Sequence, residues 1–201
     1  MFASRNYGLS RKSMNIHQLQ VTYLVEHDRI LVRLNTHAGE ELRLWLTRRM
    51  IKNLFPHMLQ ASTEIAAPLA LTASHDGADR RALAEFKKQE TLQKTDFNTP
   101  FNTQAAVLPI GGDPLLATTV HVTPTDKGSL RIGFEEKVPG AAKPRGFEVT
   151  LGPGLLPGFM HLLELALKHA DWGIALREVE TVQETNPIDA FATAQPPKYL
   201  N

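Results

Sequence analysis

The feature that most constrains the fold is a change of hydrophobic period that occurs twice along the chain. In each case three short stretches alternate apolar and polar residues, and the third leads into a stretch with helical spacing. A period of two is typical of a strand that buries one face, and apolar residues three and four apart are typical of an amphipathic helix. Each segment is therefore predicted to be a strand–strand–strand–helix (βββα) unit.

The first βββα unit is predicted at residues 16–66. Thr47 is a suitable N-cap for its helix, because a threonine hydroxyl can accept a hydrogen bond from a free amide of the first turn. Pro56 lies inside the helical stretch and is expected to kink or divide it. The apolar residues that define the three strands and the helix are, in chain order, Leu19, Val21, Tyr23 and Val25; Ile30, Val32 and Leu34; Leu42, Leu44 and Leu46; and Met50, Ile51, Leu54, Phe55, Met58 and Leu59.

The second βββα unit is predicted at residues 115–173, and its last strand and helix align with those of the first unit without a gap. Leu42, Leu44 and Leu46 fall on Phe147, Val149 and Leu151, and Met50, Ile51, Leu54 and Phe55 fall on Leu155, Leu156, Phe159 and Met160. We interpret this match as an internal duplication with pseudo-two-fold symmetry. The alternative is that any antiparallel sheet followed by a helix would look alike.

The remaining segments have a different character. Residues 67–114 are predicted to be a linker with one charged helix over 79–94. Residues 1–15 are expected to be a disordered leader, in which Met14 is a plausible second start instead of Met1. Residues 174–201 are expected to form a short C-terminal strand and then a flexible tail.

Composition excludes several classes of protein. The chain has no cysteine, so disulfide scaffolds, thiolate zinc sites and cysteine nucleophiles are ruled out. A formal net charge of +1 supplies no overall field that attracts nucleic acid. No apolar run approaches the roughly 18 residues of a membrane helix, and no secretory signal is evident. We therefore expect a cytoplasmic protein without a membrane partner.

The predicted fold class is α+β, with antiparallel sheets covered by helices. Arg33, Arg43 and Trp45 are the candidate binding residues on the outward face of the first unit. An indole can stack on a base while guanidinium groups hold phosphate, which suits single-stranded nucleic acid. Tryptophan and arginine are equally common anchors of protein interfaces, and the second unit could also cover this face. The residues expected to point outwards are Gln20, Thr22, Leu31, Arg33, Arg43 and Trp45 in the first unit, and Thr119, His121, Arg131, Glu135, Glu148 and Thr150 in the second.

Arg48 and Arg49, at the start of the first predicted helix, are a second candidate site. Cations are unusual at a helix N-terminus, because they oppose the helix dipole. Beside free backbone amides they could hold a phosphate or a carboxylate. Alternatively, their side chains reach solvent or the nearby Glu40 or Glu41.

No catalytic or cofactor motif is present. None of the eight histidines has a recognised zinc spacing, and no dinucleotide-binding, P-loop or GxSxG pattern occurs in its required context. We therefore expect no metal, no cofactor and no catalysis. The leading hypothesis is a binding or adaptor protein that contacts another protein or a second copy of itself through the sheet face. The alternatives are single-stranded nucleic-acid binding and an enzyme with a site between the two units.

Overall fold

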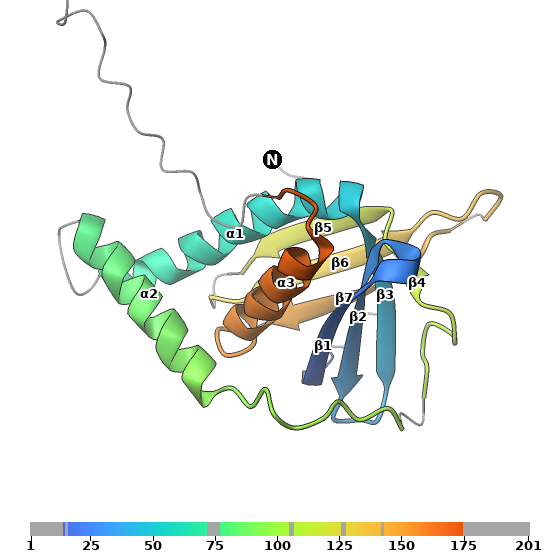
Figure 1. The fold of residues 1–201 in the computed structure, drawn as a ribbon, viewed down its shortest axis with the longest axis horizontal. Helices are drawn as coiled ribbons and strands as arrows, with labels where there is room; N and C mark the ends of the chain where they lie inside the picture. The colour runs from blue at the N-terminus through green and yellow to red at the C-terminus, as the bar shows by residue number, and fades with distance from the viewer. Residues whose placement is uncertain are drawn as a thin grey trace, which may run out of the picture.

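The fold is a mixed α+β arrangement with two sheets and three helices over the part of the chain that is described (Figure 1). The predicted leader, apart from Met14, and the predicted tail, apart from Ile174, lie outside the described residues. The residues that the computed structural model describes are 14, 16–71, 77–104, 107–125, 128–141 and 143–174.

The first sheet contains β1 (Ile16–Leu24), β2 (Arg29–Thr36), β3 (Glu41–Thr47) and β4 (Leu115–Leu116), in that order. The first three strands are antiparallel, as their alternating patterns predict, and β4 runs parallel to β3. The inner-face residues of β2 and β3 are at most 2% exposed, which is why the period of two is so clear in their sequences. These inner-face residues are Ile30, Val32, Leu34, Leu42, Leu44 and Leu46.

The second sheet contains β5 (Thr119–Pro124), β6 (Leu130–Glu136) and β7 (Arg145–Leu151), all antiparallel and in that order. The chain passes from one sheet to the other immediately before β5. Ala117 N donates to Trp45 O in the first sheet at 3.1 Å, and Thr118 N donates to Glu135 O in the second at 2.8 Å. Leu115 and Leu116 therefore belong to the first sheet, although the sequence pattern assigns them to the second unit.

The three helices are α1 (Arg48–Leu71), α2 (Gly77–Lys94) and α3 (Leu156–Ala170). Thr47 Oγ1 accepts a hydrogen bond from Met50 N at 3.3 Å, as expected of an N-cap. The expected division of the first helix at Pro56 is wrong, because α1 continues to Leu71. Phe55 and Met58, on either side of the proline, are fully buried, and their burial offsets the cost of about 3 kcal/mol for a proline inside a helix.

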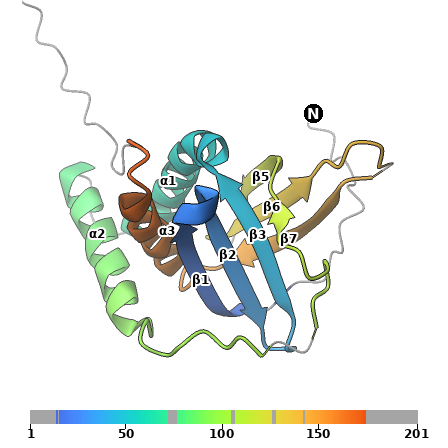
Figure 2. The ribbon, with the colours of Figure 1, turned by 45° about the vertical axis from the view of Figure 1, so that its right-hand side comes forward.

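The inner faces of the two sheets, α1 and α3 enclose one continuous hydrophobic core (Figure 2). α1 follows the first sheet along the chain but packs beside β5 of the second, and α3 follows the second sheet but packs beside β1 of the first. Each helix therefore packs against the first strand of the other sheet. This exchange places α1 and β5 side by side and creates the groove described below.

Candidate functional site

The outer face of the first sheet carries the predicted residues in two rows across the strands. One row contains Gln20, Arg33 and Arg43, which are paired across β1, β2 and β3. The next row contains Thr22, Leu31, Trp45 and Leu116. Arg33, Arg43 and Trp45 are all partly exposed, which agrees with the outward orientation that alternation predicts for them.

A buried carboxylate neutralises part of the charge of the two arginines. The Glu41 side chain is 0% exposed, and both Arg33 Nε and Arg43 Nε donate to its Oε1 at 2.7 Å. Arg43 Nη2 also donates to Glu41 Oε2 at 3.2 Å. Burial alone would raise the pKa of Glu41, but the hydrogen bonds from Arg43 and Arg33 outweigh it and hold that pKa below its ordinary value. The two guanidinium groups are therefore committed to a partner inside the molecule.

Residues between α2 and β4 cover the same row of the outer face. This covering segment, residues 95–104 and 107–114, runs along one end of the first sheet and then beside it (Figures 1 and 2). The Phe101 ring centroid lies 4.5 Å from Arg33 Cζ, and Gly112 O accepts from Arg43 Nη1 at 3.5 Å. Only 16% of the Arg33 side chain and 28% of the Arg43 side chain remain exposed.

Trp45 lies one row away from this charge cluster and is half-buried. Its cross-strand neighbours are Leu31 and Leu116, and the His27 ring centroid lies 5.2 Å from that of the indole. We call His27, Leu31, Trp45 and Leu116 the Trp45 patch. It is an apolar area with an aromatic centre, bordered on one side by Arg33 and Arg43, whose charge Glu41 neutralises in part.

Arg48 and Arg49 are both exposed in the first turn of α1. Arg48 Nη2 donates to Trp172 O at 3.1 Å, so its side chain ties the start of α1 to the chain just after α3. Within the described part of the chain, no polar partner is found for Arg49. The structure therefore does not gather the five predicted residues into one site: Arg33 and Arg43 share Glu41, Trp45 has its own patch, and Arg48 is engaged elsewhere.

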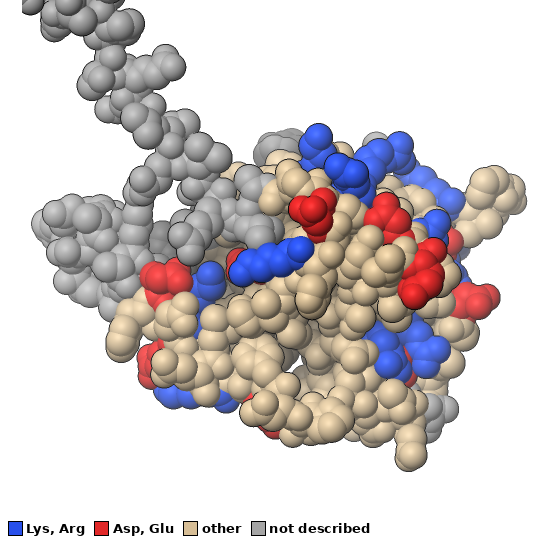
Figure 3. Space-filling model, viewed as in Figure 1, with Lys and Arg blue, Asp and Glu red and all other residues tan. Residues whose placement is uncertain are grey.

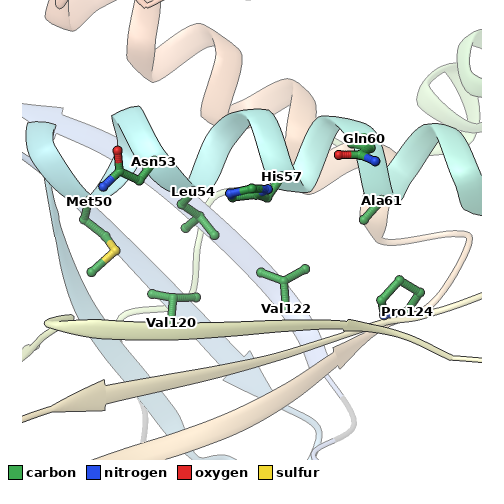
Figure 4. Close-up of a pocket in the computed structure, with 9 residues that line it drawn as sticks. All are labelled: Met50, Asn53, Leu54, His57, Gln60, Ala61, Val120, Val122 and Pro124. Atoms are coloured by element: carbon green, nitrogen blue, oxygen red, sulfur yellow. The ribbon is translucent and has the colours of Figure 1, made fainter.

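A groove of about 400 Å³ lies between α1 and β5, and sequence reasoning did not identify it. Figure 4 shows Val120 and Val122 pointing from β5 towards α1, with Met50 and Leu54 pointing back towards the strand. The signal in the sequence is weak, because the polar residues of α1 that line the groove simply follow one side of its apolar stripe. The remaining lining residues are Asn53, His57, Gln60, Ala61 and Pro124.

The edge of β5 beside the groove has no strand partner among the described residues, since β5 is the first strand of its sheet. Thr125 N donates to Ser129 O at 2.8 Å at the start of the turn to β6. Hydrogen bonding alternates along an antiparallel pair, so His121 and Thr123 also bond to β6, and the backbone of Val120 and Val122 faces the free edge. Pro124 falls in the same outward set, which suits a residue without an N–H group.

The outer face of the second sheet differs from expectation at Glu135. This residue points outwards by alternation but is only 3% exposed, and its Oε1 atom has no hydrogen-bond partner. His121 Nε2 lies 3.8 Å from Glu135 Oε1, and Arg131 Nε lies 3.9 Å from Glu148 Oε1. Among the described residues, no three histidine, aspartate or glutamate side chains are grouped so that they could hold a metal ion.

The chain matches no protein-family model, and no curated protein or solved structure is significantly similar to it. None of the helices in the described ranges has an apolar stretch long enough to cross a bilayer.

Proposed function

We propose that this chain is a non-catalytic binding protein, an adaptor that contacts another protein through the Trp45 patch. The observation that carries this proposal is the buried Glu41 carboxylate, which both Arg33 and Arg43 contact at 2.7 Å. It offsets one of the two positive charges on the outer face of the first sheet, and the next row of that face holds an aromatic residue between two leucines. Such a centre, with polar groups at its border, resembles the anchor region of a protein interface.

Single-stranded nucleic acid fits this face less well. Binding a phosphate backbone requires cations that can exchange their counterions for phosphates. Here Arg33 and Arg43 would first have to leave Glu41, and Phe101 and Gly112 of the covering segment already contact them. A protein partner needs neither change, because it can bury Trp45 while the charge cluster remains intact.

Two inferences from the sequence accompany this proposal. The order β1, β2, β3, α1 and later β5, β6, β7, α3 suits an ancient duplication of one βββα unit, related by pseudo-two-fold symmetry. The reciprocal packing of α1 beside β5 and of α3 beside β1 supports that interpretation. We also propose that the protein is cytoplasmic.

The test is a titration of a purified partner, first identified by affinity purification, against the wild-type chain and two variants. Trp45→Thr removes the indole and keeps a residue that suits a strand. Loss of a central tryptophan typically costs about 2 kcal/mol, so we expect roughly 30-fold weaker binding. Val138→Thr is the matched control, because Val138 is 47% exposed in the loop after β6 and should leave the affinity unchanged.

Two further measurements separate the alternatives. If the partner is a second copy, the mass in solution rises with concentration for the wild type and remains that of a monomer for Trp45→Thr. A labelled single strand of about 16 nucleotides tests the nucleic-acid hypothesis. Strand binding that falls steeply with salt and disappears in Arg43→Ala would contradict the proposal.

A further inference from the structure

We propose that the groove between α1 and β5 binds an acidic, extended segment of a partner protein, which adds to the second sheet as a strand beside β5. This surface is separate from the Trp45 patch, so the inference goes beyond the proposed function. It combines three properties: an unpaired strand edge, a floor that accepts alternate side chains, and basic residues at the end of the groove where α1 begins.

The unpaired edge supplies the main-chain contacts. The N–H and C=O groups of Val120 and Val122 face away from β6, as the bond from Thr125 N to Ser129 O and the alternation of the ladder require. An extended segment laid along this edge would pair with those groups as a further antiparallel or parallel strand. The six residues of β5 extend about 20 Å, which matches a segment of about six residues.

The floor of the groove determines which side chains of the bound segment fit. Val120 and Val122 are only partly buried, although they project from the same face of the sheet as the fully buried Ile132 and Val149. Every second side chain of an added strand would point into the groove and cover these valines together with Leu54 (Figure 4). The polar groups of α1 along the groove can accept or donate hydrogen bonds at its rim. We therefore expect apolar residues at alternate positions of the ligand.

Basic residues beside one end of the groove favour an acidic ligand. None of the residues that line the groove is Lys, Arg, Asp or Glu, but Arg48, Arg49 and Lys52 lie in the first two turns of α1, whose first acidic residue is Glu64. Figure 3 shows basic side chains gathered over the N-terminal part of α1. The positive end of the α1 dipole lies at the same end of the groove and adds to this potential. Carboxylates on the solvent side of the bound strand would meet this field and speed its association.

The experiment measures fluorescence anisotropy of labelled peptides of about eight residues with the full chain. In the first peptide, valine alternates with glutamate, and in the second, lysine replaces every glutamate. We expect the acidic peptide to bind roughly tenfold more tightly at low salt, with a smaller difference at high salt because ions screen exposed charges. Equal affinity of the two peptides would contradict the charge argument and overturn the proposal.

Backbone methylation tests strand addition directly. Two further acidic peptides carry N-methyl groups on alternate amides, in one register or in the other, so their side chains are unchanged. Because only one set of amides in a paired strand points at its neighbour, one register should abolish binding and the other should preserve it. If both methylated peptides bind as tightly as the parent, the ligand does not add as a strand and the proposal fails.

Variants of the chain locate the site. Arg49→Glu should weaken binding of the acidic peptide and strengthen binding of the lysine peptide. Lys137→Glu, a change at an exposed residue in the loop after β6, should alter neither affinity. Asn53→Trp should fill the groove and abolish binding while its circular dichroism remains that of the wild type. Trp45→Thr should leave peptide binding intact, so failure here and failure of the proposed function remain distinguishable.

Two outcomes would assign the groove to another occupant and overturn the proposal. Peptide binding that appears only after residues 175–201 are removed would show that the chain's own C-terminal segment occupies the groove. A dimer in the wild type that Asn53→Trp converts to a monomer would show that a second copy does.

Discussion

α3 and α1 occupy comparable places, each beside the first strand of a sheet, yet α3 contacts β1 more extensively, while a groove lies between α1 and β5. The apolar side of α3 is at most 4% exposed at every position that faces the core, through Phe159, Met160 and Leu163 to Leu167. Apolar side chains of both strands are only partly covered, Val120 and Val122 on β5 and Leu19 and Val21 on β1. The difference is that α3 contacts β1 more extensively than α1 contacts β5, where the groove lies.

One difference lies in the residues that flank the apolar stripe of each helix. In the gapless alignment of the two units, His57 falls on Leu162 and Gln60 falls on Leu165. Leu162 is partly buried and extends the apolar surface of α3, whereas Leu165 is 43% exposed. On α1 the polar side chain of His57 lines the groove instead.

The other difference is a clamp that closes only the α3 side. Trp172 Nε1 donates to Asp28 Oδ1 at 2.7 Å, and the indole meets the Tyr23 ring edge-on with centroids 5.6 Å apart. Tyr23 also donates its hydroxyl hydrogen to Asp28 Oδ1 at 2.9 Å. The end of α3 is thereby fixed to the turn between β1 and β2. No comparable cluster joins α1 to β5 among the described residues.

Trp172→Ala should have the largest effect on this comparison. Trp172 is 5% exposed, and truncation of a buried tryptophan costs about 3 kcal/mol or more. We expect urea unfolding to show a decrease of this size in the free energy of unfolding. Gln60→Ala, on the open side, should change the free energy of unfolding by less than about 0.5 kcal/mol. Equal losses in the two variants would show that the groove edge is as tightly packed as the clamp.

The Asp28 charge should have a smaller effect that depends on pH. Hydrogen bonds from Trp172 and then Tyr23 hold the pKa of Asp28 below its ordinary value of 3.8. A lowered pKa in the folded state stabilises the fold fully above the unfolded value, and this contribution disappears as pH falls through the folded value. The stability difference between wild type and Asp28→Asn should therefore be constant near neutral pH and shrink below about pH 4.

Denaturant midpoints across the acid range would measure this difference. Asn is a suitable replacement because Asp28 has a φ of 46°, a left-handed conformation that asparagine tolerates. Asp96→Asn is a control, because Asp96 is exposed and accepts hydrogen bonds within its own turn. This variant should leave the near-ultraviolet signal of Trp172 unchanged. A difference that grew on acidification would contradict the assigned direction of the Asp28 shift.

Local periodicity predicted the strands and helices well because their burial is one-sided. β2, β3 and the beginning of α1 were predicted from alternation, helical spacing and the Thr47 cap. The pairing of α1 with β5 could not be predicted, because it joins segments about 65 residues apart and leaves no local pattern. Leu115 and Leu116 are too short a stretch to show alternation, so the switch between sheets was also missed.

The candidate residues were predicted more completely than the residues that contact them. Alternation correctly placed Arg33, Arg43 and Trp45 on the outer face, since side-chain direction follows from the period alone. Glu41 is two residues before Arg43 on the same strand, so the sequence did contain a signal for that ion pair. The covering segment and the groove had no such signal, because each depends on chain that returns from far along the sequence.

The smallest effect should come from converting the open side towards the closed one with His57→Leu. A leucine there would cover part of Val122 and should stabilise the chain by about 0.5 kcal/mol, because only a fraction of the new side chain can be buried in so open a groove. Thermal unfolding would measure this gain, and anisotropy would show weaker binding of the acidic peptide. Lys52→Leu is the control for stability alone, since Lys52 is exposed and does not line the groove. An equal gain from both variants would mean that helix propensity, not closure of the groove, is responsible.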